Sequence, residues 1–397
     1  MSMKTVVVGG GAAGFFLAIN LKERMPQMDV TICEQADRVL RKVEVSGGGR
    51  CNCTNTFEGV KDLAAVYPRG HRLMKRLFRQ FDYRDAYAWF ENHGVPLTVQ
   101  DDHCVFPASQ DAHSIIDCFT GACRHLGVHI RTGCKIESPD TLAGYDFVAV
   151  TTGGQPRAAG LQWLEGMGHD IVAPVPSLFT LQIDDPALTR LMGLVVEEAA
   201  VMMPGTRFRA SGPLLITHWG MSGPAILRLS SYAARHLHDC GYRCPLAVNW
   251  LGLNENEVAA QLADFIAQHP QKQVDTMPPF PLPGRLWEYL AHKSIGLKAQ
   301  RRWAETGRKE RNQLVNALCN DTYDVSGKGA FKEEFVTCGG VALTSVNPNT
   351  MESRVCPHLY FAGEVLDIDG VTGGFNFQAA WTTAYTAAKA IADAGKI

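Results

Sequence analysis

The chain has 397 residues, with 38 basic and 40 acidic side chains, and 46% of its residues are hydrophobic. This length predicts two or three domains with self-sufficient cores. The formal net charge of −2 excludes a strongly basic nucleic-acid coat protein, and the hydrophobic fraction excludes a disordered tail.

The N-terminal segment predicts the start of a parallel α/β sheet. Residues 4–8 (KTVVV) form a buried strand, residues 13–25 an apolar helix that Pro26 ends, and residues 29–33 (DVTIC) a second buried strand. Further helices and short strands are expected at 71–92, 111–126, 128–132 and 146–151.

The pattern of apolar and polar residues changes near residue 186. Residues 190–216 alternate between apolar and polar side chains and predict short antiparallel strands. A helix is expected from Ser222, as its N-cap, to Asp239, and Gly241 follows its end. A strand at 242–251, helices between 254 and 320, a strand at 359–362 and a helix at 376–394 are expected after it.

This order predicts one α/β domain interrupted by an inserted α+β domain that has a β part and a small helical part. The first part of the α/β domain is expected at 1–185 and its last part at 330–397. The insert is expected at 186–329, with its helical part at about 254–328. The last segment would then complete the sheet that the first segment begins.

A dinucleotide fingerprint, Gly9-x-Gly11-x-x-Gly14, lies between the first strand and the first helix. Such glycines permit a tight turn, close approach of a diphosphate and close packing of helix on strand. Glu34 ends the second strand at the distance, about 20 residues, where a carboxylate holds a ribose. The carboxylate favours FAD or NAD over NADP.

Three later features favour FAD over NAD. Residues 45–55 (VSGGGRCNCTN) form a long glycine-rich loop that suits phosphate and isoalloxazine contacts. The strand at 359–362 ends in Gly363-Glu364, where an acid near the flavin ribitol is expected, and Asp367 and Asp369 are alternatives. Gly373-Gly374 opens the last helix, whose N-terminus would stabilise a reduced anionic flavin.

Together these motifs resemble the BaiN/YhiN-type flavoproteins, some of which are described as aminoacetone oxidases. The resemblance rests on segments in the same order along nearly the whole chain: 6–14, 45–55, 105–117, 217–227, 335–343 and 359–381. It implies a Rossmann-like FAD-binding domain of the glutathione-reductase type, interrupted by an insert. The residues expected to border FAD are Gly9, Gly11, Ala12, Ala13, Gly14, Glu34, Gln35, Lys42, Ser46, Gly47, Gly48, Gly49, Arg50, Cys51, Asn52, Gly153, Gly363, Glu364, Asp369, Gly373, Gly374, Phe375 and Asn376.

Four other patterns suggest additional or alternative functions for particular residues. Cys51-x-Cys53 has thiols suited to redox chemistry, although a bridge at this spacing is strained. The run from His236 to Cys244 has metal-ligand residue types in no standard zinc spacing, and no metal is expected. Residues 285–311 hold eight Lys/Arg against three Asp/Glu, which indicates a solvated face or an RNA contact. His218, within THWG, is the candidate proton donor or acceptor.

The leading hypothesis is an FAD-dependent oxidoreductase that transfers hydride at flavin N5 to or from a small molecule, with NADH or NADPH as a transient donor. Only one GxGxxG unit is evident, so a nicotinamide must dock without a second dinucleotide fold. The alternatives are a tRNA-modifying FAD enzyme and a flavin-binding protein without turnover. Scattered cysteines and the lack of a membrane-spanning pattern predict a cytoplasmic protein, with nucleic acid and membrane not expected as partners.

Overall fold

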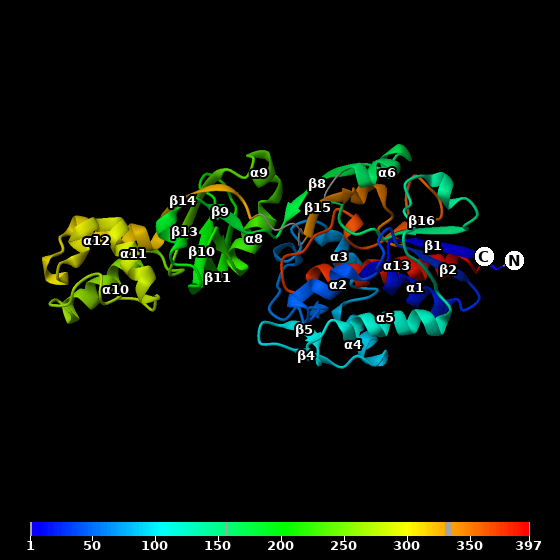
Figure 1. The fold of residues 1–397 in the computed structure, drawn as a ribbon, viewed down its shortest axis with the longest axis horizontal. Coiled ribbons are helices and arrows are strands. Elements are labelled where there is room, and N and C mark those ends of the chain that lie inside the picture. The colour runs from blue at the N-terminus through cyan, green and yellow to red at the C-terminus, as the bar shows by residue number, and fades with distance from the viewer. Residues whose placement is uncertain (1, 156–157, 330–335, 397) are drawn as a thin grey trace. The chain divides into compact units, whose positions relative to one another are not determined.

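The computed structural model describes residues 2–155, 158–329 and 336–396. The chain divides into two compact units (Figure 1). Unit 1 consists of Met1–Pro176 and Val336–Ile397, and unit 2 consists of Ser177–Phe335. Unit 1 is therefore built from both ends of the chain.

A five-stranded parallel sheet in the order β16-β7-β1-β2-β6 forms the centre of unit 1. The valines of β1 are buried, as expected for a central strand covered on both faces. The edge strand β16, which follows the insert in sequence, pairs with β7 and so completes the sheet. The strands are β1 (Lys4–Val8), β2 (Asp29–Cys33), β6 (His129–Arg131), β7 (Phe147–Val150) and β16 (Leu359–Phe361).

Two smaller sheets accompany this one. The antiparallel order β3-β5-β4 links Thr54–Asn55, Cys104–Pro107 and Leu97–Val99. The second sheet pairs β8 (Ile171–Ser177) with β15 (Val336–Val341), which lie on the two sides of the insert in sequence.

Helix α1, whose residues Ala13–Lys22 are all buried, packs against α13 and α5. The Phe16 ring of α1 lies 5.1 Å from that of Trp381 on α13, and Figure 1 shows these two helices side by side. The helices are α1 (Ala12–Arg24), α2 (Arg41–Val45), α3 (His71–Leu77), α4 (Tyr83–Asn92), α5 (His113–Leu126), α6 (Gln162–Gly166) and α13 (Phe375–Ala394), with 3₁₀ turns at Ser46–Gly48, Leu63–Ala65, Pro139–Leu142, Ala158–Leu161, Leu343–Ser345 and Gly363–Val365.

Unit 2 contains a closed antiparallel barrel in the order β10-β11-β12-β9-β14-β13. Its core is continuous with that of the helical part, because Trp250 and Leu318 belong to the same buried cluster. The strands are β9 (Leu181–Ile183), β10 (Val195–Met202), β11 (Arg209–Thr217), β12 (Gly220–Ser222), β13 (Cys244–Asn249) and β14 (Asp321–Lys328).

The helical part of unit 2 joins β13 to β14. It consists of α10, α11 and α12, with α12 packed against both other helices. The helices of unit 2 are α7 (Pro186–Thr189), α8 (Pro224–Tyr232), α9 (Ala234–Asp239), α10 (Glu255–Gln268), α11 (Gly284–Ile295) and α12 (Arg308–Cys319), with 3₁₀ turns at Gly296–Gln300 and Trp303–Glu305.

The structure corrects two expected boundaries of the insert. A start at 186 omits β9, which pairs with β12 and β14 and is needed to close the barrel. A helical part that extends to 328 wrongly includes β14, which pairs with β13 along Cys244–Val248. Both errors arise because short barrel strands are recognised by partners far away in sequence.

Two expected helices are also interrupted. The pattern at 71–92 divides because Asp82 caps α4 with a capping box that includes Asp85. The helix expected at 222–239 divides at Ala233, and its N-cap is Gly223 rather than Ser222, which ends β12. Across the described residues, no helix is long and apolar enough to cross a membrane.

His169 gives unit 1 a defined response to pH. Its Nδ1 donates to the Leu164 carbonyl at 2.9 Å, and its Nε2 lies 2.8 Å from the Ser353 hydroxyl. Burial lowers the pKa of His169, so below the unfolded pKa of about 6.5 the unfolded chain binds a proton that the folded chain does not. We predict that stability falls between about pH 7.5 and pH 5.5, and falls less in His169→Gln, as urea denaturation would measure. Equal pH dependence in the two proteins would contradict this role.

Candidate functional site

The turn between β1 and α1 excludes side chains at two of its glycines. A Cβ at Gly9, where φ is 114°, would lie 2.5 Å from the Thr151 carbonyl oxygen. A Cβ at Gly14 would lie 2.1 Å from the Gly9 carbonyl oxygen. The Thr151 hydroxyl also donates to this carbonyl at 2.9 Å. The predicted fingerprint thus brings the start of α1 against the ends of β1 and β7.

The N-terminus of α1 is open where the glycine turn meets it. A Cβ at Gly11 would meet nothing within 4 Å, and no side chain caps the helix. The first intrahelical bond runs from Phe15 N–H to Gly11 C=O at 3.1 Å, so the amides of Ala12 and Ala13 precede it. These amides and the helix dipole form an anion site. Thr152 lies beside this turn, since a Cβ at Gly9 would come within 2.9 Å of its Cα, and its hydroxyl oxygen is buried without a hydrogen-bond partner.

Glu34 lies beside the same turn, at the end of β2. Its Oε2 accepts from Gly10 N–H at 2.7 Å, and its Oε1 accepts from Ala36 N–H at 2.8 Å. Each oxygen keeps a further lone pair with which it can accept a ribose hydroxyl. The neighbouring Gln35 side chain is exposed. The residues of this turn therefore fit the diphosphate and ribose of a dinucleotide.

The glycine-rich loop after α2 has an unusual backbone. Gly47, Gly48 and Gly49 have φ of 56°, 70° and 83°, and Cys51 has φ of 60°. The Cys51 N–H donates to the Ser46 carbonyl at 3.0 Å and closes the loop. The three glycines are exposed, so their backbone is accessible to a ligand.

The end of this loop is fastened to the start of α13. A Cβ at Gly374 would lie 2.2 Å from the Thr54 carbonyl oxygen, so the two backbones touch. The Asn52 amide, oriented to satisfy both its atoms, accepts from Gly374 N–H at 3.2 Å and donates to Thr54 C=O at 2.9 Å. Asn55 donates to the Gly373 carbonyl at 3.0 Å. The structure thus brings together two glycine-rich segments that are more than 300 residues apart.

Gly363 and Glu364 lie at the edge where the first glycine turn begins. A Cβ at Gly363 would approach the Ala13 side chain to 2.8 Å. The Glu364 carboxylate pairs with Lys42 Nζ at 2.9 Å and accepts from Thr337 N–H at 2.8 Å. A Cβ at Gly153 would lie 3.9 Å from this carboxylate. Glu364 therefore joins α2, β15 and the segment after β7.

Asp369 faces the protein interior. Its side chain is fully buried in an ion pair with Arg69. Asn376 is likewise used within the loop, since its amide accepts from Gly370 N–H at 2.8 Å and donates to Gly370 C=O at 2.9 Å. The Phe375 carbonyl accepts the Tyr67 hydroxyl at 2.8 Å. These contacts shape the turn before α13, and the expected flavin contact of Asp369 stays a prediction that its burial does not favour.

The thiols of Cys51 and Cys53 are fully buried. Burial raises the pKa of Cys51 to about 12 and that of Cys53 well above its usual range. Both thiols are therefore protonated near neutral pH and poorly suited to thiolate redox chemistry. Arg50 lies over the Phe106 ring, 4.4 Å from its centroid, and donates to Gln110 at 3.2 Å.

The candidate catalytic residue His218 belongs to unit 2, whereas every candidate cofactor residue belongs to unit 1. His218 is exposed in the turn between β11 and β12, and its ring centroid lies 4.2 Å from that of Trp219. Among the described parts of the chain, no group of three His, Cys, Asp or Glu side chains could hold a metal ion.

Sequence reasoning missed Thr151, Thr152 and Thr337. The first two directly follow β7, which pairs with β1, so their position at the carboxyl edge of the sheet was the signal that could have found them. Thr337 contributes a backbone amide to Glu364, and no side-chain pattern marks such a role.

Comparison with known families gives a match over residues 3–390 to the HI0933-like protein Rossmann domain. The chain belongs to this family. Membership confirms the predicted BaiN/YhiN-type resemblance, the Rossmann-like fold class and the enzyme class, an FAD-dependent oxidoreductase.

Two curated relatives match over nearly their whole length. The 3-dehydro-bile acid Δ(4,6)-reductase of Clostridium scindens is 26% identical over 412 residues, which cover 98% of each chain. The ribosomal RNA dihydrouridine synthase of Escherichia coli is 26% identical over 405 residues, which cover 97% of this chain and 96% of that one. Among solved structures, 3-ketosteroid Δ1-dehydrogenase from Sterolibacterium denitrificans has a TM-score of 0.51 at 11% identity, covering 98% of this chain and 99% of that chain, and shares the fold.

The contrast between Gly14 and Gly11 tests the cofactor site. Gly14→Ala should lower the melting temperature and abolish retention of FAD, because its Cβ meets the Gly9 carbonyl. Gly11→Ala should keep the melting temperature but bind FAD about tenfold more weakly, a loss of ~1.4 kcal/mol, because its methyl enters the open space over α1. Flavin absorbance after gel filtration measures retention. Unchanged FAD binding in Gly11→Ala would contradict this placement.

The buried ion pair gives a second prediction. Asp369→Asn should destabilise the protein by about 3–5 kcal/mol, because it leaves the largely buried Arg69 without its counter-charge. Urea denaturation measures the change. The control Asp393→Asn alters an exposed carboxylate and should change stability by less than about 0.5 kcal/mol. A fully stable Asp369→Asn variant with weakened FAD binding would instead support the original expectation.

Proposed function

We propose that this protein is an FAD-dependent reductase that saturates a carbon–carbon double bond conjugated to a carbonyl group, with NADH or NADPH as electron donor. The single observation that carries the proposal is the dinucleotide cradle of unit 1, in which the open N-terminus of α1 lies beside Glu34. The acceptor class comes from the relatives.

The names of the two curated relatives describe related chemistry on different molecules. One is a Δ(4,6)-reductase of 3-dehydro bile acids, and the other forms dihydrouridine in ribosomal RNA. A 3-oxo steroid with double bonds at these positions and a uracil ring both contain a double bond conjugated to a carbonyl. Both reductions add hydride at one carbon and a proton at the other. The shared acceptor is therefore an activated alkene.

FAD bound in this cradle would supply hydride transfer at its N5 position. The residues of the chain bind and orient it. The amides of Ala12 and Ala13 would hold the diphosphate, and Glu34 would accept the ribose hydroxyls. The positive N-terminus of α13, at Gly374, would stabilise negative charge on the flavin. His218 is proposed to deliver the proton to the alkene, because an exposed imidazole is a common general acid.

Anaerobic spectroscopy tests this function. The purified protein should show flavin absorption that bleaches within seconds on addition of NADH or NADPH, and a conjugated enone should restore it. Flavin that neither nucleotide bleaches, but an amine substrate does, would point to an oxidase and contradict the proposal. Flavin that reacts no faster than free FAD would indicate a binding protein without turnover.

His218→Asn isolates the proton step. We expect flavin reduction by the nicotinamide to remain unchanged, while reoxidation by the enone falls by roughly 10²-fold, within the range for general acid catalysis. Stopped-flow absorbance separates the two half-reactions. A variant with unchanged reoxidation at every pH would exclude His218 as the proton donor.

A further inference from the structure

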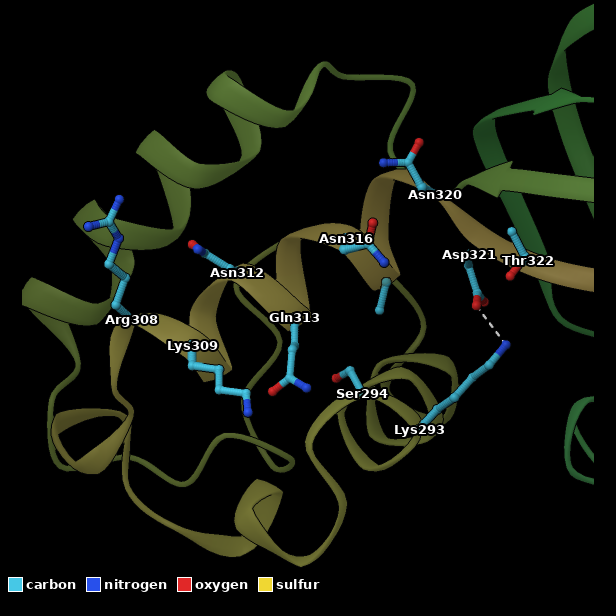
Figure 2. Close-up of a pocket in the computed structure, with 11 residues that line it drawn as sticks. Lys293, Ser294, Arg308, Lys309, Asn312, Gln313, Asn316, Asn320, Asp321 and Thr322 are labelled. Carbon is cyan, nitrogen blue, oxygen red and sulfur yellow. Dashed lines mark hydrogen bonds and ion pairs between the residues drawn. The ribbon is translucent and has the colours of Figure 1, made fainter. Parts of the chain in front are cut away.

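A polar groove of about 780 Å³ lies in the helical part of unit 2. It is bounded by the end of α11, by α12 and by the start of β14. Its lining contains three cations, four side-chain amides and one carboxylate: Lys293, Arg308, Lys309, Asn312, Gln313, Asn316, Asn320 and Asp321. Figure 2 shows Lys309 and Gln313 pointing from α12 toward Ser294 on α11.

The groove is formed by one polar face of α12. Lys309, Gln313, Asn316 and Asn320 follow the spacing of a single helical face. The opposite face packs Leu314 and Leu318 into the core of unit 2. Two groove residues are already used within the protein, since Lys293 pairs with Asp321 and the Asn320 amide donates to Glu255. Among the described residues, the other cations and amides of the groove have no side-chain partner, and they are available for a ligand: Arg308, Lys309, Asn312, Gln313 and Asn316.

Most cations between residues 285 and 311 already have partners within the protein. Lys293 pairs with Asp321 at 2.6 Å and Lys298 with Glu310 at 2.6 Å. The guanidinium groups of Arg285, Arg302 and Arg311 donate to a backbone carbonyl, to Gln271 and to Thr306, respectively.

Three exposed cations of this segment have, among the described residues, neither an ion-pair nor a hydrogen-bond partner for their side chains: Arg301, Arg308 and Lys309. Arg308 and Lys309 both line the groove, and Arg301 does not. Two of the three cations without a partner therefore lie together at one end of a polar opening. Cations suit phosphates, whereas amides suit sugar hydroxyls and base edges.

We propose that this groove binds a single strand of RNA, with Arg308 and Lys309 on its phosphates and the amides of α12 on its riboses and bases. The inference rests on the proposed function only for the chemistry, since a uracil ring is one acceptor of the proposed class. A purely apolar substrate such as a steroid would find no complementary surface in this polar groove.

Fluorescence anisotropy with a short uracil-rich labelled RNA tests the proposal in the intact protein. The double variant Arg308→Gln/Lys309→Gln should raise Kd by about tenfold near 0.1 M salt and reduce the salt slope by about 1.4, because two phosphate contacts are lost. The matched control Arg301→Gln removes an exposed cation outside the groove and should change Kd by less than about twofold.

Three outcomes would overturn the proposal. The first is the absence of RNA binding by the unmodified protein, and the second is an equal loss of affinity in the double variant and in Arg301→Gln. The third is equal affinity for DNA of the same sequence, which would show attraction to phosphate charge alone, because RNA recognition requires contacts to the 2′-hydroxyls.

Flavin content and bleaching by NADH or NADPH are measured on the same preparations. All variants should match the unmodified protein in both, since the altered residues belong to unit 2 and the cofactor residues to unit 1. RNA binding without nicotinamide-dependent bleaching would refute the proposed function and leave the groove assignment intact. Bleaching without RNA binding would refute the groove assignment and leave the proposed function intact.

Discussion

The contact between the backbones of Gly9 and Gly14 is the constraint on which the candidate cofactor site depends. A Cβ at Gly14 would meet the Gly9 carbonyl and a Cβ at Gly9 would meet the Thr151 carbonyl, so no side chain fits at either position. The Thr151 hydroxyl, directly after β7, donates to the Gly9 carbonyl, and the Gly9 N–H donates to the Cys33 carbonyl at the end of β2. Three neighbouring strands therefore fix the direction of α1, and its unpaired amides open onto free space.

Segments far apart in the sequence complete the cradle around this contact. The strand β16 and helix α13 follow the insert, yet they pair with β7 and pack along α1. Gly363 lies against Ala13, and Gly374 lies against Thr54. The α/β unit thus requires its C-terminal segment both for the sheet and for the site. An insert can occupy the intervening sequence because the connections at β8 and β15 pair with each other.

Local patterns could be predicted from the sequence, and long-range partners could not. The bounds of β1 and β2 match their predicted ranges, since apolar runs and glycine spacing act over a few residues. The family resemblance extended this success to the fold class. The barrel strand β14 was mistaken for part of the helical region, because its strand character depends on pairing with β13 and β9.

The partners of charged residues were likewise not predictable from the sequence. Asp369 is a plausible flavin contact by its position in the chain, but Arg69, 300 residues away, neutralises it in the core. Conversely, the basic segment 285–311 contains eight cations, and only the structure shows that Lys293 and Lys298 are paired with carboxylates. The fold determines which charged groups meet. The sequence alone therefore suggests a flavin contact for a buried, paired carboxylate and a basic face with more unpaired cations than the structure shows.

The most direct test of the central claim is to identify the nucleotide released when the purified protein is denatured. After reconstitution with excess cofactor and gel filtration, we expect the protein to release FAD in a ratio near one per chain. Release of NAD instead, or failure to retain any dinucleotide, would contradict the assignment of the β1–α1 turn and Glu34 to FAD.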